Sequence, residues 1–139
     1  MKHPLWVCAA LGVLAAFASR SFAAEFSAAD LEFFEAKIRP LLDQHCSSCH
    51  ANGKSKGGLS LASRDAMLKG GDSAQPAVVP GAPDQSPLIV AVKYDDAVKM
   101  PKKYKLKDQE IAVLVAWVKR GAPWAAATGA DGSHRRRLD

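Results

Sequence analysis

The chain has 139 residues, of which 48% are hydrophobic and 24% are charged, and its formal net charge is +5. This size predicts a single globular domain and excludes a second hydrophobic core. The positive charge is too small to indicate a nucleic-acid-binding protein, and it falls to +3 if the first 23 residues, which include Lys2 and Arg20, are removed.

Residues 1–23 have the pattern of a secretory signal peptide that is removed after Ala23. Lys2 gives a positive start, an uncharged apolar run of 14 residues covers positions 5–18, and small residues precede the cleavage point. The run is shorter than the roughly 20 apolar residues that span a bilayer. We therefore expect a periplasmic or otherwise exported protein; an uncleaved segment, which would be its membrane contact, is the alternative.

The domain itself is expected at residues 24–127 and begins with a helix. Ser27 is a predicted N-cap, and Leu31, Phe34, Ile38 and Leu41 follow helical spacing, which gives one buried stripe. Pro40 lacks a backbone donor and disfavours helical geometry at the residue before it. We therefore expect a kink or a break there, with a further turn or two up to residue 46.

The next segment, Cys46-Ser47-Ser48-Cys49-His50, has the pattern of c-type haem attachment. The two thiols can each add to one porphyrin vinyl group as thioethers, and His50 can then offer its imidazole to the iron. Because Cys8 leaves with the signal, these are the two cysteines of the exported chain. A lone pair two residues apart is not a disulfide framework for a small exported fold.

A zinc site and a redox-active thiol pair are the two alternatives to haem attachment. A zinc site would use the same three groups and require a fourth ligand, and the remaining histidines of the exported chain are His45, beside the motif, and His134, in the tail. A thioredoxin-like redox pair requires a strand-helix-strand setting, which the pattern does not predict. Both alternatives are therefore disfavoured.

The middle of the chain, residues 51–107, is predicted to be mostly irregular because glycine and proline pairs punctuate it. Short helices are expected at 64–69, capped by Ser63, and at 87–92, capped by Ser86. So long an irregular stretch indicates that a large cofactor fills part of the core. Met100, followed by Pro101 in a polar loop, is the predicted sixth ligand of the iron, whereas Met67 is predicted to pack in the core.

The last helix is predicted at 108–120, with acidic residues at its start, a basic end and Gly121 as the stop. It is expected to pack across the first helix. No alternating strand pattern is present, so the predicted class is all-α. The basic segment 128–139 is predicted to be a disordered tail.

The chain resembles the small planctomycete-type cytochrome c domain, a family of class I c-type cytochromes, over Phe33 to Trp124. The stretches that carry the resemblance are Phe33-Phe34-Glu35, Ile38-Arg39-Pro40-Leu41-Leu42, Cys46-Ser47-Ser48-Cys49-His50, Lys56-Gly57-Gly58-Leu59, Gly70-Gly71-Asp72-Ser73, Val79-Pro80-Gly81, Ser86-Pro87-Leu88, Lys99-Met100-Pro101, Trp117-Val118 and Gly121-Ala122-Pro123-Trp124. It implies a class I cytochrome c fold, with crossing N- and C-terminal helices and with short helices and long loops around one covalent haem. It also implies His50 and Met100 as axial ligands.

Two features depart from that family. Lys107 stands where members often have a small polar cap, so we expect Asp108 to cap the last helix instead. The large domains that usually follow are missing from this chain. The resemblance therefore implies a haem module, and nothing of what those whole proteins do.

If protein side chains fill both axial positions, the iron has no open site, and the predicted function is transfer of single electrons rather than enzyme catalysis. A haem-based sensor or small-ligand-binding module, in which Met100 is displaced, is the alternative. The sequence offers no distal base or arginine pair for a peroxidase. A redox protein partner with an acidic surface is expected to dock near a positive run made of Lys99, Lys102, Lys103, Lys105 and Lys107.

Two finer predictions concern the surroundings of the haem. The second imidazole nitrogen of His50 is expected to donate to a carbonyl of the Val78-Val79-Pro80 turn, because a rigid turn holds its carbonyls still. Five apolar residues are expected to line the haem or simply to pack in the core: Leu59, Leu61, Leu88, Val92 and Trp117.

Overall fold

The computed structural model describes residues 26–125, which form helices and loops and contain no strand, so the predicted all-α class is confirmed. The helical segments are α1 (Ala28–Phe33), η1 (Phe34–Ile38, a π-helix), α2 (Arg39–His45), α3 (Ser47–His50), η2 (Lys56–Gly58), α4 (Arg64–Lys69), η3 (Pro83–Gln85), α5 (Pro87–Lys93) and α6 (Asp108–Lys119). The predicted signal peptide, 1–23, and the predicted tail, 128–139, lie outside the described residues.

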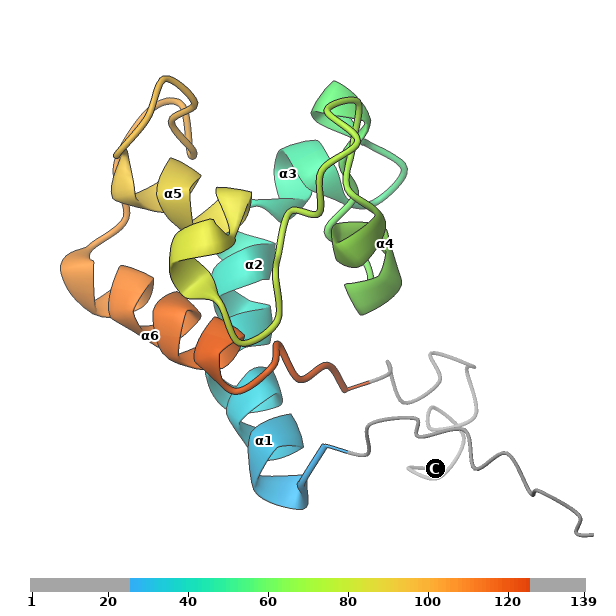
Figure 1. Ribbon diagram of the computed structural model, residues 1–139, viewed down its shortest axis with the longest axis vertical. Helices are drawn as coiled ribbons and strands as arrows, with labels where there is room; N and C mark the ends of the chain where they lie inside the picture. The colour runs from blue at the N-terminus through green and yellow to red at the C-terminus, as the bar shows by residue number, and fades with distance from the viewer. Residues whose placement is uncertain (1–25, 126–139) are drawn as a thin grey trace, which may run out of the picture.

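The first three segments run on from one another as one helix from residue 28 to 45 (Figure 1). It begins as predicted, because the Ser27 hydroxyl oxygen accepts a hydrogen bond from the Asp30 backbone N–H at 3.1 Å. Of the kink or break expected at Pro40, the break is wrong, because the helix continues through this position. The wider π-turns of η1, closed by a bond from the Arg39 N–H to the Phe34 carbonyl, come directly before the proline, and Arg39 keeps helical dihedral angles.

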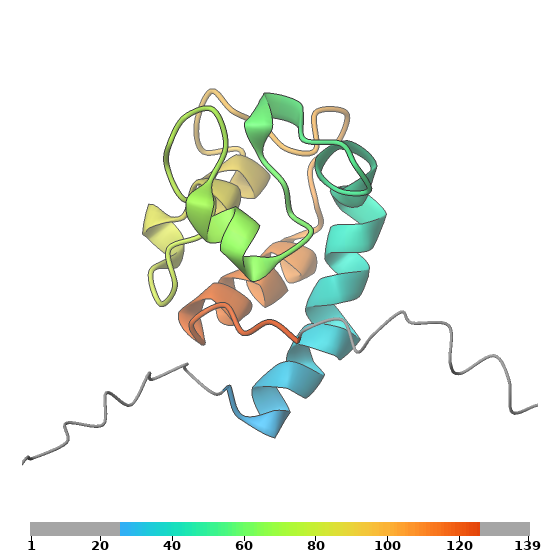
Figure 2. The same cartoon turned by 90° about the vertical axis from the view of Figure 1, so that its right-hand side faces the viewer.

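Helix α6 packs against η1 and forms the main core, and Figures 1 and 2 both place it beside the long first helix. Phe34 and Trp117 are fully buried there, with ring centroids 6.4 Å apart. The Trp117 Nε1–H donates to the Pro123 carbonyl at 2.7 Å, so the indole is buried without leaving its donor unpaired. Each such aromatic side chain contributes about 1.5–3 kcal/mol through burial.

The shorter helices follow their predicted positions closely. Helix α4 begins where Ser63 accepts from the Ala66 N–H at 3.2 Å, and its Met67 is 1% exposed, which confirms the core assignment of that residue. Helix α5 starts at Pro87, but the Ser86 hydroxyl does not cap it. Ser86 is fully buried instead and accepts from the Val79 N–H at 2.9 Å, so it fixes the preceding turn.

The start of α6 differs from the prediction that Asp108 caps it. Lys107 occupies the N-cap position, and its backbone N–H donates to the Glu110 carboxylate at 2.8 Å. This bond is the main cause of the lowered pKa of Glu110, ahead of its interaction with His45. The Glu110 carboxylate in the first turn thus accepts a hydrogen bond from a backbone N–H at the helix start, and so stabilises this end in place of a small polar cap.

Within residues 26–125, no helix is long and apolar enough to cross a membrane.

Candidate haem site

Helix α3 is a single turn that brings the two cysteines and His50 together. The Cys46 carbonyl accepts hydrogen bonds from the Cys49 N–H at 3.1 Å and from the His50 N–H at 3.0 Å. Residues three positions apart on such a turn lie on the same side of it. Both thiols are free and half-buried.

Burial raises the pKa of the Cys46 thiol to about 11, and the neighbouring Cys49 adds to the shift. The thiol is therefore protonated at neutral pH. Redox-active Cys-x-x-Cys pairs have the opposite property, since they work through a thiolate whose pKa is lowered. The local environment thus disfavours the thiol-disulfide alternative.

The imidazole of His50 is oriented by a backbone carbonyl. Its Nδ1 lies 3.1 Å from the Leu59 oxygen, and the His50 carbonyl in turn accepts from the Leu61 N–H at 2.7 Å. A carbonyl can only accept, so Nδ1 carries the proton and Nε2 keeps its lone pair free for a metal. The same arrangement is common for histidines that bind metals in proteins.

The predicted acceptor in the Val78-Val79-Pro80 turn is therefore wrong. That turn is bonded elsewhere: its Val79 N–H donates to Ser86, and the following Gly81 N–H donates to the Val118 carbonyl of α6 at 2.8 Å. The turn is therefore bonded to α6 and not to His50.

Two glycine-rich turns hold the Leu59 carbonyl in place. The Asp72 N–H donates to the Gly57 carbonyl at 2.8 Å, which joins the segment after α4 to the segment around η2. A Cβ atom added at Gly71 would lie 2.3 Å from the Gly57 oxygen and 2.8 Å from the Leu59 nitrogen. Only glycine allows this close approach of the two backbones.

Met100 lies on a different segment, the loop of residues 95–107 between α5 and α6, which we call the Met100 loop. Its side chain is half-buried, and its N–H donates to the Ala91 carbonyl of α5 at 3.0 Å. The backbone of Cys46, Cys49 and His50 thus lies on one turn, and Met100 lies on a separate loop. Its pairing with His50 across an iron stays a prediction.

The apolar residues proposed to line the haem are found in or against the core. Leu61, Val92 and Trp117 are buried, and Leu59 and Leu88 pack against them half-buried. Within residues 26–125, the structure gathers no group of three or more His, Cys, Asp or Glu side chains that could hold a metal ion.

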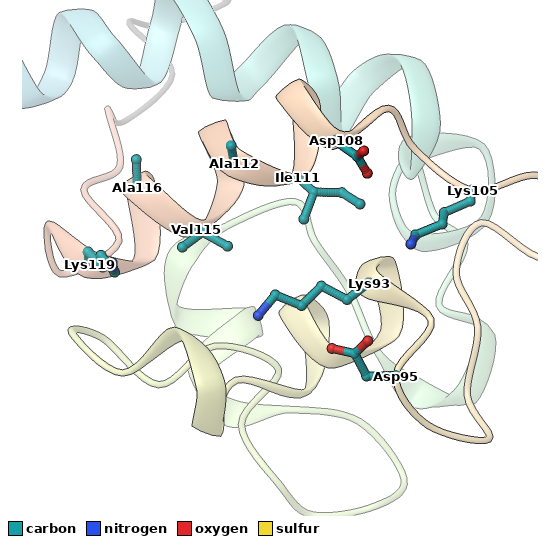
Figure 3. Close-up of a pocket in the computed structure, with 9 residues that line it drawn as sticks. All are labelled: Lys93, Asp95, Lys105, Asp108, Ile111, Ala112, Val115, Ala116 and Lys119. Atoms are coloured by element: carbon teal, nitrogen blue, oxygen red, sulfur yellow. The ribbon is translucent and has the colours of Figure 1, made fainter.

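A groove of about 460 Å³ lies between α5 and α6 (Figure 3). Ile111 and Val115 point into it from α6, and Lys93 borders it from the other side. None of the predicted haem residues lines it.

Sequence reasoning missed three residues near the site. The Nδ1 atom of His45 lies 2.9 Å from the Tyr104 hydroxyl oxygen, and the Tyr94 hydroxyl donates to the Pro101 and Tyr104 carbonyls. His45 was visible in the sequence as the neighbour of Cys46, but its partner is 59 residues away. No local pattern indicates such a pair.

The donors on this turn fit a c-type haem: two unpaired thiols at the attachment spacing and one imidazole with a free Nε2 lone pair. Comparison with curated proteins gives no match, and neither does comparison with solved structures. Residues 46–103 match the model of the family described as Planctomycete cytochrome C, and this match contains Cys46, Cys49, His50 and Met100. Residues 46–103 of this chain are therefore similar to the Planctomycete cytochrome C family.

Proposed function

We propose that this protein is an exported c-type cytochrome that carries single electrons on one covalent haem, with His50 and Met100 as axial ligands. The observation that carries the proposal is the single turn of α3, on which two free thiols are followed by a histidine whose Nδ1 is already bonded to Leu59. The family match over residues 46–103 supports the same conclusion. The class I fold is part of the proposal, and the packing of α6 against η1 supports it.

In this proposal Cys46 and Cys49 hold the haem through thioether bonds, and the free Nε2 of His50 binds its iron. When bound, the haem supplies one reversible electron at its iron. The Leu59 carbonyl fixes the plane of the His50 ring and, by accepting a hydrogen bond from its Nδ1–H, makes the imidazole a more electron-donating ligand. These residues therefore set both the attachment and part of the redox potential.

Met100 is the proposed sixth ligand because it is a half-buried thioether on a loop that is tied to α5 at the Ala91 carbonyl. A thioether favours the reduced iron more than a second imidazole would and so raises the potential. With both axial positions filled by side chains, no position remains for a substrate. An electron carrier, which is the general role of cytochrome c domains, is therefore favoured over an enzyme.

The proposed docking surface for a redox partner is the outer side of the Met100 loop. Lys99, Lys102 and Lys103 are exposed there, and among the described residues none of them forms a salt bridge. Val98 is 59% exposed beside them and offers an apolar contact. Unpaired positive charge around a small apolar patch suits a transient complex with an acidic protein.

This docking surface is tested by reversing charge at Lys99, Lys102 and Lys103 to glutamate. Steering by charge changes association rates by about 10- to 1,000-fold, so we expect at least a tenfold slower electron transfer to an acidic redox protein at low salt, and little difference at high salt. The matched control reverses Lys37, Lys69 and Lys119, which are exposed outside this loop. If the loop variant and the control variant transfer electrons at the same rate at low salt, the proposed docking surface is wrong.

The axial ligands are tested by absorption spectroscopy of protein matured with its haem, before and after carbon monoxide is added to the reduced form. A low-spin spectrum that carbon monoxide does not change supports a closed site and electron transfer. The control is Met100→Ala, which is expected to bind carbon monoxide readily. Ready binding by the unaltered protein would contradict Met100 ligation and favour the sensor alternative.

A further inference from the structure

His45 and Tyr104 connect the haem-attachment turn to the Met100 loop. His45 is the last residue of α2, directly before Cys46, and its side chain is 8% exposed. Its Nδ1 atom lies 2.9 Å from the hydroxyl oxygen of Tyr104, and the two rings meet edge to face with centroids 5.7 Å apart. Tyr104 follows Met100 by four residues. The bond therefore joins a fixed point beside one cysteine to the segment that carries Met100.

The direction of this hydrogen bond follows from the other side of the imidazole. Nε2 of His45 is buried, makes no hydrogen bond and lies 3.4 Å from the Glu110 Oε1 atom. Facing a carboxylate, Nε2 is the nitrogen that carries the proton, so Nδ1 accepts and the Tyr104 hydroxyl donates. Glu110 is itself fixed by the Lys107 N–H. Glu110 thus holds the imidazole in the orientation in which Nδ1 can accept the hydrogen bond from Tyr104.

The other side of the same loop is held by Tyr94, which ends α5 in a left-handed conformation. Its hydroxyl donates to the carbonyls of Pro101 and Tyr104. The segment from Met100 to Tyr104 is therefore fastened to α5 on one side and to the end of α2 on the other. Because Tyr104 is 48% exposed, burial of its ring contributes only part of what holds it, and the hydroxyl bond gives the contact its direction.

We propose that the His45–Tyr104 hydrogen bond keeps the Met100 loop closed over the attachment turn and so holds the Met100 thioether at the sixth position. His45 and Tyr104 are then positioning residues, which touch neither the iron nor a redox partner. This proposal rests on the proposed function, in which Met100 is the axial ligand. It predicts that the loop opens more often when the bond is lost, while the attachment of the haem is unchanged.

The test measures how tightly imidazole displaces the native sixth ligand in the oxidised holoprotein, followed by the loss of the methionine-to-iron absorption band. Tyr104→Phe removes only the hydroxyl, and we expect imidazole to bind about two- to tenfold more tightly, which corresponds to the net worth of one hydrogen bond. Amide hydrogen exchange in the Met100 loop is measured on the same samples and should accelerate by a similar factor.

Variants at His45 separate the hydrogen bond from general packing. His45→Leu should raise imidazole affinity as Tyr104→Phe does. His45→Asn, whose side-chain amide lies near the position of Nδ1, can accept from Tyr104 and should restore the native affinity. Arg39→Ala serves as a control that loses the contacts to Glu35 and Ala125 without touching the loop, and Asp95→Ala as a control at an exposed position in the loop itself. Both should bind imidazole as the unaltered protein does.

The possible results separate this proposal from the proposed function. If Met100→Ala opens the sixth position but Tyr104→Phe and His45→Leu bind imidazole like the unaltered protein, the His45–Tyr104 proposal is wrong and Met100 ligation stands. If Met100→Ala also behaves like the unaltered protein, Met100 is not the ligand and both proposals are wrong. An effect of His45→Leu that His45→Asn does not reverse would also overturn the role of the hydrogen bond.

Discussion

Replacing Gly71 by alanine tests how the backbone positions His50. The added Cβ would lie 2.3 Å from the Gly57 oxygen and 2.8 Å from the Leu59 nitrogen, whereas ordinary contact begins at 3.4 Å. Gly71 is not among the described glycines with positive φ, so its backbone conformation suits alanine and only the contact opposes it. The two segments must therefore separate by about 1.1 Å at the closest point.

This displacement moves Leu59, which lies two residues after Gly57 and whose carbonyl accepts the hydrogen bond from His50. The His50 Nδ1 to Leu59 oxygen distance is 3.1 Å, and a comparable shift takes it beyond hydrogen-bonding range. Overpacking of this kind costs about 1–3 kcal/mol, and loss of the bond adds about 1 kcal/mol. For a domain of this size, each kcal/mol lowers Tm by about 4–8 °C, so we expect a Tm lower by about 10 °C or more.

The redox potential distinguishes this mechanism from general destabilisation. Without its acceptor, the His50 imidazole becomes a less electron-donating ligand, so the midpoint potential of Gly71→Ala should rise. The control is Gly53→Ala, where nothing lies within 4 Å of the added Cβ but φ is +80°. That variant should lose about 1–2 kcal/mol from its backbone alone and keep its potential. An unchanged potential and Tm in Gly71→Ala would refute the positioning of Leu59 by these turns.

Two further substitutions test the contacts of the first helix and the core. Arg39→Ala should cost about 1–2 kcal/mol at pH 7, because Arg39 pairs with Glu35 at 2.7 Å and donates to the Ala125 carbonyl at 2.9 Å; Arg39→Lys is its control. The hydrogen bond from Arg39 is the main cause of the lowered pKa of Glu35, so the stability difference should be full above pH 4.5 and shrink as the pH falls further, as thermal unfolding at pH 7 and at acid pH would show. Trp117→Phe should cost about 2–4 kcal/mol in denaturant unfolding, since it leaves a cavity and removes the donor to the Pro123 carbonyl; a cost below 1 kcal/mol would contradict the core assignment.

Local patterns predicted the parts of the fold that depend on neighbouring residues. The cap at Ser63 and the proline at 87 gave helices α4 and α5 nearly to the residue, and the periodicity of the last helix located α6. The same approach failed at Pro40, because the π-turns that come before it are not visible as a change in apolar spacing. A proline signals a lost donor, but it does not reveal how the preceding turn compensates.

In the candidate site, too, the features that depend on neighbouring residues could be predicted, and those that depend on long-range contacts could not. The attachment spacing predicts Cys46, Cys49 and His50 as the haem site, since its chemistry lies within five adjacent residues. The partner of His50 was mispredicted because several carbonyls in turns are equally plausible from sequence. Which one approaches the imidazole depends on the contact of Gly71 with Gly57, which is tertiary. The His45–Tyr104 pair is likewise a long-range contact that composition cannot indicate.

The most direct test of the central claim is the intact mass of the protein purified from a host that matures c-type cytochromes. One covalent haem should be present, and a Cys46→Ser, Cys49→Ser double variant should carry none. The same spectrum shows whether residues 1–23 are removed, as the sequence predicts. A protein that is exported and folded but has the mass of the bare polypeptide would contradict haem attachment at α3, and with it the proposed electron carrier.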